Sequence, residues 1–189
     1  MKSDGLLLPI AAPSGTGKTT VCRKLLDYSD SFVFSISCTT RPPRPDEKDG
    51  VDYHFISKER FKEYVKNDML VEWEDVFNDY YGTLKSAVEK ALESGKILLL
   101  DIDVKGALNI KNLYPGKAVS IFLLPPNYEE LKRRLHFRGT EDKKSISLRS
   151  ARIPDEMKFG KLFDYVIVND KIDKTVEEII NIIKERKRK

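Results

Sequence analysis

The sequence predicts an α/β fold, a three-layer arrangement in which helices cover both faces of a mainly parallel β-sheet. Two observations carry this prediction. Short apolar runs of strand length recur along the 189 residues and alternate with helix-like segments, which is typical of parallel sheets. The first apolar run leads directly into a glycine-rich turn that ends in a lysine and a threonine. A strand, such a turn and a helix in this order predict a binding site for phosphate groups.

Five apolar runs are the expected strands of this sheet. Each is short enough for a buried strand and is followed by polar or turn-forming residues. In chain order they are Leu6–Ala11, Phe32–Ile36, Ile97–Leu100, Val119–Leu124 and Tyr165–Val168. The first run contains Pro9, and a proline cannot donate a hydrogen bond within a sheet. We therefore expect either a bulge or a locally unpaired position beside Pro9.

Three further segments carry helical signals. An apolar stripe at helical spacing lies near the C-terminus and consists of Val176, Ile179, Ile180 and Ile183. Asp173 precedes this stripe and is the expected N-cap, because its carboxylate can accept from the free N–H groups of the first helical turn. A second helix is expected over residues 85–94, where Gly95 ends it, and a third over residues 58–67.

Two segments interrupt the alternation of strands and helices. Residues 37–82 are polar, aromatic and basic, with short strand-like pieces at 53–56 and 70–73. They predict a substrate-binding lobe inserted into the core. Residues 138–152 are charged and have no apolar periodicity, which is typical of a mobile lid. A length of 189 residues with 40% hydrophobic content fits one globular domain that carries both insertions.

Composition limits the expected partners and location. The net charge of +4 would permit weak contact with nucleic acid, but the basic residues lie in separate clusters, so we expect no specific nucleic-acid partner. No apolar run approaches the ~18 residues of a membrane-spanning helix, so no membrane partner is expected. Cys22 and Cys38 form neither a metal-ligand spacing nor a disulfide framework, which favours a cytoplasmic location.

The glycine-rich turn is the strongest functional signal. Gly15 and Gly17 allow backbone N–H groups to point inward and, with the next helix N-terminus, to bind β- and γ-phosphate oxygens. Lys18 adds a positive charge, and Thr19 adds a hydroxyl for Mg²⁺. The P-loop consensus for such phosphate-binding turns has Gly where this chain has Ala12. The alternative, an ordinary glycine-rich turn, would explain neither Lys18 nor Thr19. The residues expected near the phosphates are Ala12, Pro13, Ser14, Gly15, Thr16, Gly17, Lys18, Thr19 and Thr20.

A second anion-binding signal is the sequence Arg41-Pro42-Pro43-Arg44. The prolines favour an extended backbone with three residues per turn, so both arginines project to one side. Two guanidinium groups held together repel each other unless an anion lies between them, and each can bind a phosphate through two hydrogen bonds. The pattern predicts a phosphate site, and the alternative is a solvated basic turn.

Glu72 is an acid within an otherwise apolar and aromatic run. A carboxylate in such surroundings needs a partner. A base with adjacent N–H donors, such as guanine, would provide one, with the hydroxyls of Ser37 and Thr83 near its carbonyl oxygen. The alternative is a half-exposed strand acid with no binding role.

Two carboxylates, Asp101 and Asp103, follow the apolar residues 98–100. This Walker B pattern places acids at the carboxyl edge of the sheet, beside the glycine-rich turn. Asp101 and Thr19 are the expected Mg²⁺ ligands, partly through water.

Arginines also gather in and beside the expected lid. Arg134 and Arg138 are four residues apart, and Arg149 and Arg152 are three apart, so each pair would place like charges on one helix face. Such pairs are unfavourable without an anion, which predicts a lid that closes on phosphates. The alternative is a charged, exposed loop.

Six motifs, taken in order, resemble those of the guanylate kinase family over about residues 8–170. They are the glycine-rich turn, the Arg41 and Arg44 pair, Asp-Tyr-His-Phe at 52–55, Tyr-Tyr-Gly-Thr at 80–83, Leu-Asp-Ile-Asp at 100–103 and Arg-Gly-Thr-Glu at 138–141. The resemblance implies a P-loop core with a nucleotide-monophosphate lobe and a lid. It also implies Mg²⁺-dependent transfer of the γ-phosphoryl group of ATP to GMP, and to dGMP. The implied division is a core of residues 1–36, 84–137 and 153–189, a GMP-binding lobe of residues 37–83 and a lid of residues 138–152.

The resemblance further implies the role of each site residue. The implied GMP-binding residues are Ser37, Arg41, Arg44, Tyr53, Glu72, Tyr81, Thr83, Asp101 and Asp103. Asn169 is implied at the adenine of ATP, together with the glycine-rich turn at the phosphates. The implied catalytic residues are Lys18, Arg134, Arg138 and Arg149. The chain departs from the family pattern at His136 and Phe137, where a glycine commonly precedes Arg-Gly-Thr. A monomer or small homo-oligomer is expected.

Three other functions compete with this one. A regulatory GTPase would explain Asp103-Val104-Lys105-Gly106, but the chain has no Asn-Lys-x-Asp motif. A non-catalytic guanylate kinase-like binding module would have lost the P-loop, which is intact here. A kinase for another monophosphate, such as AMP or dTMP, is the closest enzymatic alternative, and it depends on what Glu72 faces.

Overall fold

The computed structural model describes residues 5–13, 15–76, 78–127, 130–131, 133 and 158–187. The expected lid of residues 138–152 and the site residues Ser14, Arg134, Arg138 and Arg149 lie outside these described residues.

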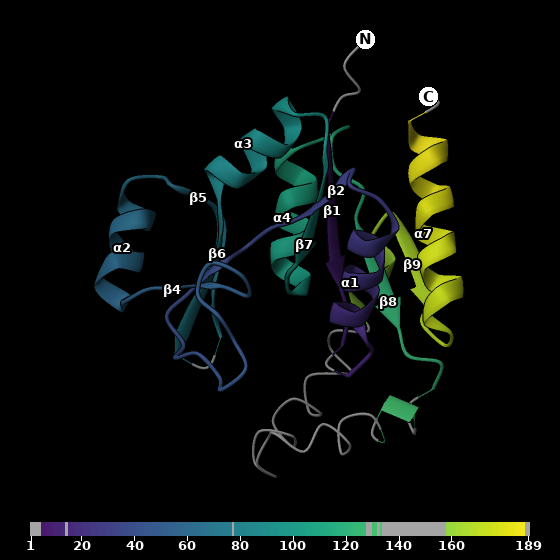
Figure 1. The fold of residues 1–189 in the computed structure, drawn as a ribbon, viewed down its shortest axis with the longest axis horizontal. Coiled ribbons are helices and arrows are strands. Elements are labelled where there is room, and N and C mark those ends of the chain that lie inside the picture. The colour runs from purple at the N-terminus through teal and green to yellow at the C-terminus, as the bar shows by residue number, and fades with distance from the viewer. Residues whose placement is uncertain are drawn as a thin grey trace.

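Within the described residues, five strands form the central sheet (Figure 1). In spatial order they are β2 (Phe32–Phe34), β7 (Ile97–Asp101), β1 (Leu6–Ala11), β8 (Ile121–Leu124) and β9 (Tyr165–Val168). Every neighbouring pair in this sheet is parallel. The predicted α/β fold is confirmed, although the second strand ends two residues earlier and the fourth begins two residues later than expected.

Helices cover both faces of this sheet (Figure 1). Helices α1 (Lys18–Tyr28) and α7 (Ile172–Arg186) pack on one face, and α3 (Lys85–Glu93) and α4 (Val104–Leu113) pack on the other. Side chains of β1 alternate between the two cores. The face toward α1 and α7 receives Leu6, Leu8 and Ile10, whereas Leu7 and Ala11 face α3 and α4. A strand buried on both faces explains the continuous apolar run in the sequence.

Pro9 lies in β1 with a strand on each side, and the sheet accommodates it without a bulge. On the β8 side, the bridge between Leu7 and Ala118 and the pair of Ile10 with Ile121 keep the same register, so no residue is inserted between them. Leu7 directs its N–H and its carbonyl toward β8, and Pro9, two residues later, has the same orientation. The position at which Pro9 lacks an N–H therefore faces the residues just before β8, where the ladder between β1 and β8 has not yet begun.

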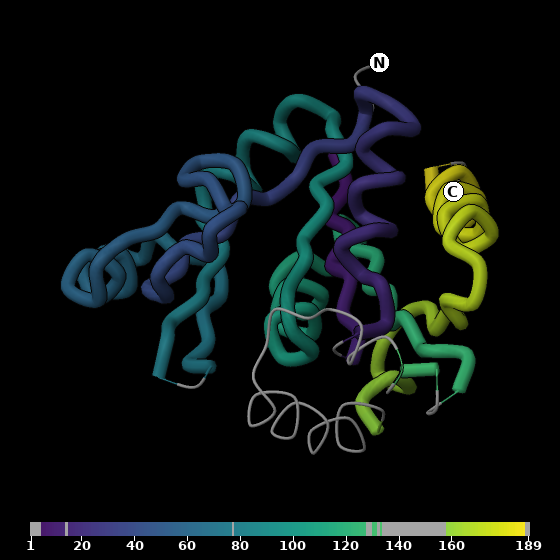
Figure 2. The backbone as a smooth tube through the Cα atoms, turned by 60° about the horizontal axis from the view of Figure 1, so that its bottom comes forward, coloured from purple at the N-terminus to yellow at the C-terminus, as the bar shows by residue number. Residues whose placement is uncertain are grey.

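A second sheet lies to one side of the first (Figure 2). Its strands, in spatial order, are β4 (His54–Phe55), β3 (Cys38–Thr39), β6 (Asp79–Leu84) and β5 (Leu70–Val76). Helix α2 (Lys58–Lys66) covers this sheet. The sequence predicted this helix over residues 58–67. The sheet and this helix share a small core of Cys38, Phe61 and Leu70. Strand β6 was not predicted, because its residues do not alternate between apolar and polar.

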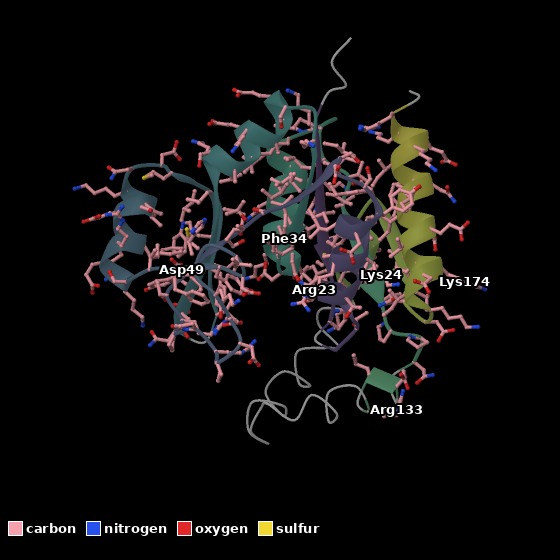
Figure 3. All side chains as sticks on the ribbon, in the orientation of Figure 1. Arg23, Lys24, Phe34, Asp49, Arg133 and Lys174 are labelled. Carbon is pink, nitrogen blue, oxygen red and sulfur yellow. The ribbon has the colours of Figure 1, made fainter. Side chains whose placement is uncertain are left out.

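Of the two helix-end signals expected from the sequence, one is confirmed and one is wrong. Gly95 follows α3 with a φ of +70°, a conformation that suits glycine at the end of a helix. The expected N-cap of α7 is wrong, because Lys171 holds that position and Asp173 lies in the first turn. Figure 3 shows Lys24 on α1, and its Nζ lies 3.0 Å from Oδ1 of Asp173. A short 3-10 helix, Gly160–Leu162, precedes β9. Every helix among the described residues is too short or too polar to span a bilayer.

Candidate active site

A cleft of about 650 Å³ lies between the carboxyl edge of the five-stranded sheet and the four-stranded sheet. This edge of a parallel sheet is where ligands commonly bind, and the volume is ordinary for a small-molecule site. Most of the described site residues that the sequence predicted line this cleft: Ala12, Pro13, Gly15, Thr16, Gly17, Lys18, Thr19, Ser37, Arg41, Arg44, Tyr53, Glu72, Tyr81, Asp101 and Asp103.

The glycine-rich turn joins β1 to α1 as predicted. Gly15 and Gly17 have φ values of +89° and +94°, which only glycine adopts readily. Gly17 is also the N-cap residue of α1, so no side chain caps the first turn, and this turn contains no acid. The N–H groups and the positive end of the helix dipole at this terminus can therefore receive an anion.

Lys18 and Thr19, the first residues of α1, both contact Asp101 at the end of β7. Nζ of Lys18 lies 2.7 Å from Oδ1 of Asp101 and donates to the carbonyl oxygen of Ile102 at 2.7 Å. The Thr19 hydroxyl donates to Oδ2 of Asp101 at 3.1 Å. The Walker B carboxylate is thus paired with the phosphate loop, as the sequence predicted.

The pair of Thr19 and Asp101 fits a magnesium ion. Two neighbouring ligands of an octahedral Mg²⁺, each about 2.1 Å from the ion, lie about 3.0 Å apart. The two oxygens are separated by 3.1 Å. Among the described residues, no cluster of three or more His, Cys, Asp or Glu side chains could hold a metal ion. An ion here would therefore take its other ligands from phosphates and water, which is the usual mode for Mg²⁺.

The structure brings Arg41 and Arg44 together on one carboxylate, that of Glu47. Nη2 of Arg41 lies 2.9 Å from Oε1 of Glu47, and Nη1 of Arg44 lies 3.6 Å from the same oxygen. The backbone N–H of Arg44 donates to Oε2 at 2.8 Å. Burial tends to raise the pKa of Glu47, but the hydrogen bonds from both arginine residues outweigh it and hold the pKa below its usual value. The anion expected between the arginines is here a side chain of the protein.

Aromatic side chains fix the orientation of Arg41. Its guanidinium carbon lies 5.6 Å from the ring centre of Tyr53 and 5.8 Å from that of Phe55, within cation–π range. Its Nε donates to the hydroxyl of Tyr81 at 3.2 Å. The family resemblance implied Tyr53 and Tyr81 beside the phosphate. In the structure the ring of Tyr53 lies against the Arg41 guanidinium, and the hydroxyl of Tyr81 accepts a hydrogen bond from it. Sequence reasoning missed Glu47, although its position three residues after Arg44 was a usable signal.

Glu72 is buried at the cleft, with 8% of its surface exposed. The pairing of β5 with β6 is irregular between Leu70 and Glu72, and Glu72 lies opposite Thr83. The Thr83 hydroxyl donates to Oε1 at 2.5 Å. Burial raises the pKa of Glu72 to about 7; the negative charges of Asp103 and Glu74 add to this rise, and the bond from Thr83 opposes it. The alternative of a half-exposed strand acid does not describe this side chain.

Asp103 and Gly106 lie beside Glu72, at the start of α4. Asp103 is the N-cap of this helix, and its Oδ1 accepts from the N–H of Gly106 at 2.7 Å. A Cβ atom on Gly106 would lie 2.7 Å from Oε2 of Glu72. Sequence reasoning noticed Gly106 only as part of a GTPase-like motif and missed its contact with Glu72.

Asn169 is fully buried and joins the phosphate loop to α7. Its Nδ2 donates to the carbonyl oxygen of Thr16 at 2.7 Å, and its Oδ1 accepts from the Thr175 hydroxyl at 2.9 Å. A Cβ atom on Gly17 would lie 2.9 Å from Nδ2 of Asn169. The described contacts of Asn169 are thus with the loop and the helix, and its role at the adenine stays a prediction.

Three described site residues lie outside the cleft lining. Thr20 is exposed on α1, Thr83 is buried against Glu72, and Asn169 is buried against Thr16.

Comparison with known proteins agrees with this arrangement. The family model described as guanylate kinase matches residues 6–186. A guanylate kinase of Chlorobium luteolum is 46% identical over 93% of this chain and 89% of its own length. One of Salinibacter ruber is 46% identical over 96% of this chain and 97% of its own. The crystal structure of guanylate kinase from Anaplasma phagocytophilum superimposes with a TM-score of 0.83 at 34% identity, covering 100% of this chain and 89% of that one.

The phosphate loop, the arginine pair and the buried acid thus share one cleft, in a chain whose relatives match it over nearly its full length. The chain belongs to the guanylate kinase family.

Proposed function

We propose that the chain transfers the γ-phosphoryl group of ATP to GMP, and to dGMP, giving ADP and the corresponding diphosphate. The observation that carries this proposal is a single cleft shared by Lys18, by Arg41 with Arg44, and by the buried carboxylate of Glu72. Transfer between two nucleotides needs two phosphate sites that open into one space, and a guanine base needs an acceptor for its N–H groups. Membership of the guanylate kinase family supports the same reaction.

ATP occupies the phosphate-loop side in this proposal. The N–H groups at the start of α1 bind its phosphate oxygens. The ammonium group of Lys18, which here pairs with Asp101, also interacts with the transferred phosphoryl group. Thr19 and Asp101 would hold Mg²⁺, which would neutralise charge at the ATP phosphates. Asn169 would lie near the adenine. By the family resemblance, Arg134, Arg138 and Arg149, which lie outside the described residues, would contact the ATP phosphates or the transferred phosphoryl group.

GMP occupies the side of the four-stranded sheet. Arg41, Arg44, Tyr53 and Tyr81 bind its phosphate, which would replace or share the contacts that Glu47 makes with the two arginines. The carboxylate of Glu72 accepts from N1–H and the 2-amino group of guanine, with Ser37, Thr83 and Asp103 completing the base site. Adenine presents a lone pair at N1, so it would leave the Glu72 charge unpaired.

The chemistry asked of these side chains is positioning and neutralisation. Phosphoryl transfer involves little covalent participation by the protein, so the rate depends on aligning the two nucleotides and on stabilising the charge of the transferred group. Lys18 supplies positive charge on one side of the cleft and the two arginines on the other. Closure of the proposed lobe (37–83) and lid (138–152) over the core would exclude water and limit hydrolysis of ATP.

We further propose that the chain acts in the cytoplasm as a monomer or small homo-oligomer, on nucleotides and not on nucleic acid. The free thiols of both cysteines agree with the cytoplasmic location.

A coupled assay of ADP formation across GMP, dGMP, AMP, CMP, UMP and dTMP tests the proposal. GMP and dGMP should give the highest kcat/KM, and removal of Mg²⁺ with a chelator should abolish turnover. Preference for AMP or dTMP would identify a different monophosphate kinase. No turnover with any acceptor, in protein that binds GMP, would identify a binding module.

A further inference from the structure

Gly106 has no backbone reason to be a glycine. It lies in the first turn of α4, in ordinary helical backbone, and is not among the glycines with positive φ. At such a position alanine is the better helix former, because glycine loses more conformational freedom on folding. The helix would therefore be more stable with a side chain here, unless that side chain met something else.

The group that it would meet is the carboxylate of Glu72. A Cβ atom at residue 106 would lie 2.7 Å from Oε2 and 3.3 Å from Cδ of Glu72, and 3.2 Å from Oδ1 of Asp103. The 2.7 Å separation from Oε2 is too short for a carbon atom, so the carboxylate would have to move, whereas the other two separations are only tight. Its freedom is limited, because Oε1 is held at 2.5 Å by the Thr83 hydroxyl and the side chain is buried. A methyl group at 106 would thus displace Glu72 from Thr83.

We propose that Gly106 is a positioning residue for base specificity. Because it has no side chain, the Glu72 carboxylate can occupy the position in which it accepts hydrogen bonds from guanine. Gly106 acts through Glu72 and touches no substrate itself. This inference rests on the proposed function of Glu72, and it adds a specificity determinant on a different element, α4.

The test is a double-mutant cycle in the full-length protein with G106A, E72A and G106A/E72A. G106A should lower kcat/KM for GMP by about 10-fold or more, mainly through KM, with the KM for ATP within 2-fold of wild type. In the E72A background the contact with Glu72 is removed and only the tight approach to Asp103 is left, so the same substitution should change GMP kinetics by less than 2-fold. The matched control is S86A, an exposed substitution in the first turn of α3 that should leave GMP kinetics unchanged.

Unfolding temperature gives a second readout that does not depend on activity. G106A should lower it in the wild-type background and raise it in the E72A background, where the conflict with Glu72 is gone and the higher helix propensity of alanine outweighs the tight approach to Asp103. If G106A alone does not fold, a folded double variant supports the steric conflict with Glu72. Equal losses in both backgrounds, in kinetics and in unfolding temperature, would overturn the inference. Opposite thermal shifts with unchanged GMP kinetics would overturn the specificity role, whereas the proposed function would still be judged by the wild-type assay.

Discussion

Glu72 is held at a cost to the folded protein. Its carboxylate is buried, and Asp103 and Glu74 add negative charge nearby, so its pKa rises from about 4.5 to about 7. Between these two values the folded chain keeps a proton that the unfolded chain releases. Stability therefore falls as the pH rises through this window, and the full loss is reached above pH 7. Such a cost at a binding site is typical of a group that is satisfied by its ligand.

The variant Glu72→Gln should remove this cost. At pH 8 we expect a higher free energy of unfolding than that of wild type, by on the order of 1–3 kcal/mol, because a neutral amide replaces a buried charge. Near pH 4 the difference should largely vanish. Urea denaturation at both pH values measures it, with the exposed acid Glu63→Gln on α2 as control. An equal or lower stability of E72Q at pH 8 would contradict the buried charge.

Lys18→Ala should nearly abolish turnover and leave the fold intact. Lys18 begins α1 and pairs with Asp101, but it belongs to neither core beside the sheet, so its loss removes little core packing. Removing the charge that faces the transferred phosphoryl group should lower kcat by ~10³-fold or more. The control is Lys24→Ala on the same helix, whose exposed ammonium pairs with Asp173 away from the cleft. Near-normal turnover of K18A would exclude a P-loop role for Lys18.

At the scale of elements, the phosphate loop is positioned by α7 as well as by β1 and α1. Asn169 follows β9 and bonds to the loop at Thr16, and Thr175, in α7, bonds to Asn169. The three groups are buried. This chain of hydrogen bonds connects a helix near the C-terminus with a loop near the N-terminus.

Thr175→Val should disturb the loop from a distance. The change keeps the shape of the side chain but removes the hydroxyl that donates to Asn169, at a cost of about 1 kcal/mol in stability. We expect a higher KM for ATP and an unchanged KM for GMP. Thr175→Ser retains the hydroxyl and serves as the control. A rise in both KM values, or in neither, would show that α7 does not position the ATP site.

Across the whole molecule, the sequence predicted those features that depend on neighbouring residues. The turn from Gly15 to Thr19 needs particular residue types at fixed spacing, and the structure places it between β1 and α1. The acids at the end of β7 and just after it, and the helix over residues 58–66, follow from equally local patterns. The resemblance of six motifs then identified the family.

The rest depends on contacts between distant segments. Gly106 is required by Glu72 on another element, and nothing around residue 106 in the sequence shows it. Pro9, which has no N–H, lies beside the segment that precedes β8, and this contact with a distant segment accompanies the late start of that strand. Asp173 had the residue type of an N-cap, but α7 begins earlier, and Asp173 pairs with Lys24 on α1. Such partners are set by the tertiary fold.

Glu72 is the residue proposed to recognise guanine within the phosphoryl-transfer cleft. The most direct test measures kcat/KM for GMP and for AMP, at saturating ATP, in wild type and in Glu72→Gln. Wild type should prefer GMP by ~10⁴-fold or more, because adenine leaves the buried carboxylate unpaired. E72Q should lose most of its activity with GMP and narrow the GMP/AMP ratio, with the KM for ATP unchanged. An unchanged GMP/AMP ratio in E72Q would contradict the account, because the base would then be recognised elsewhere.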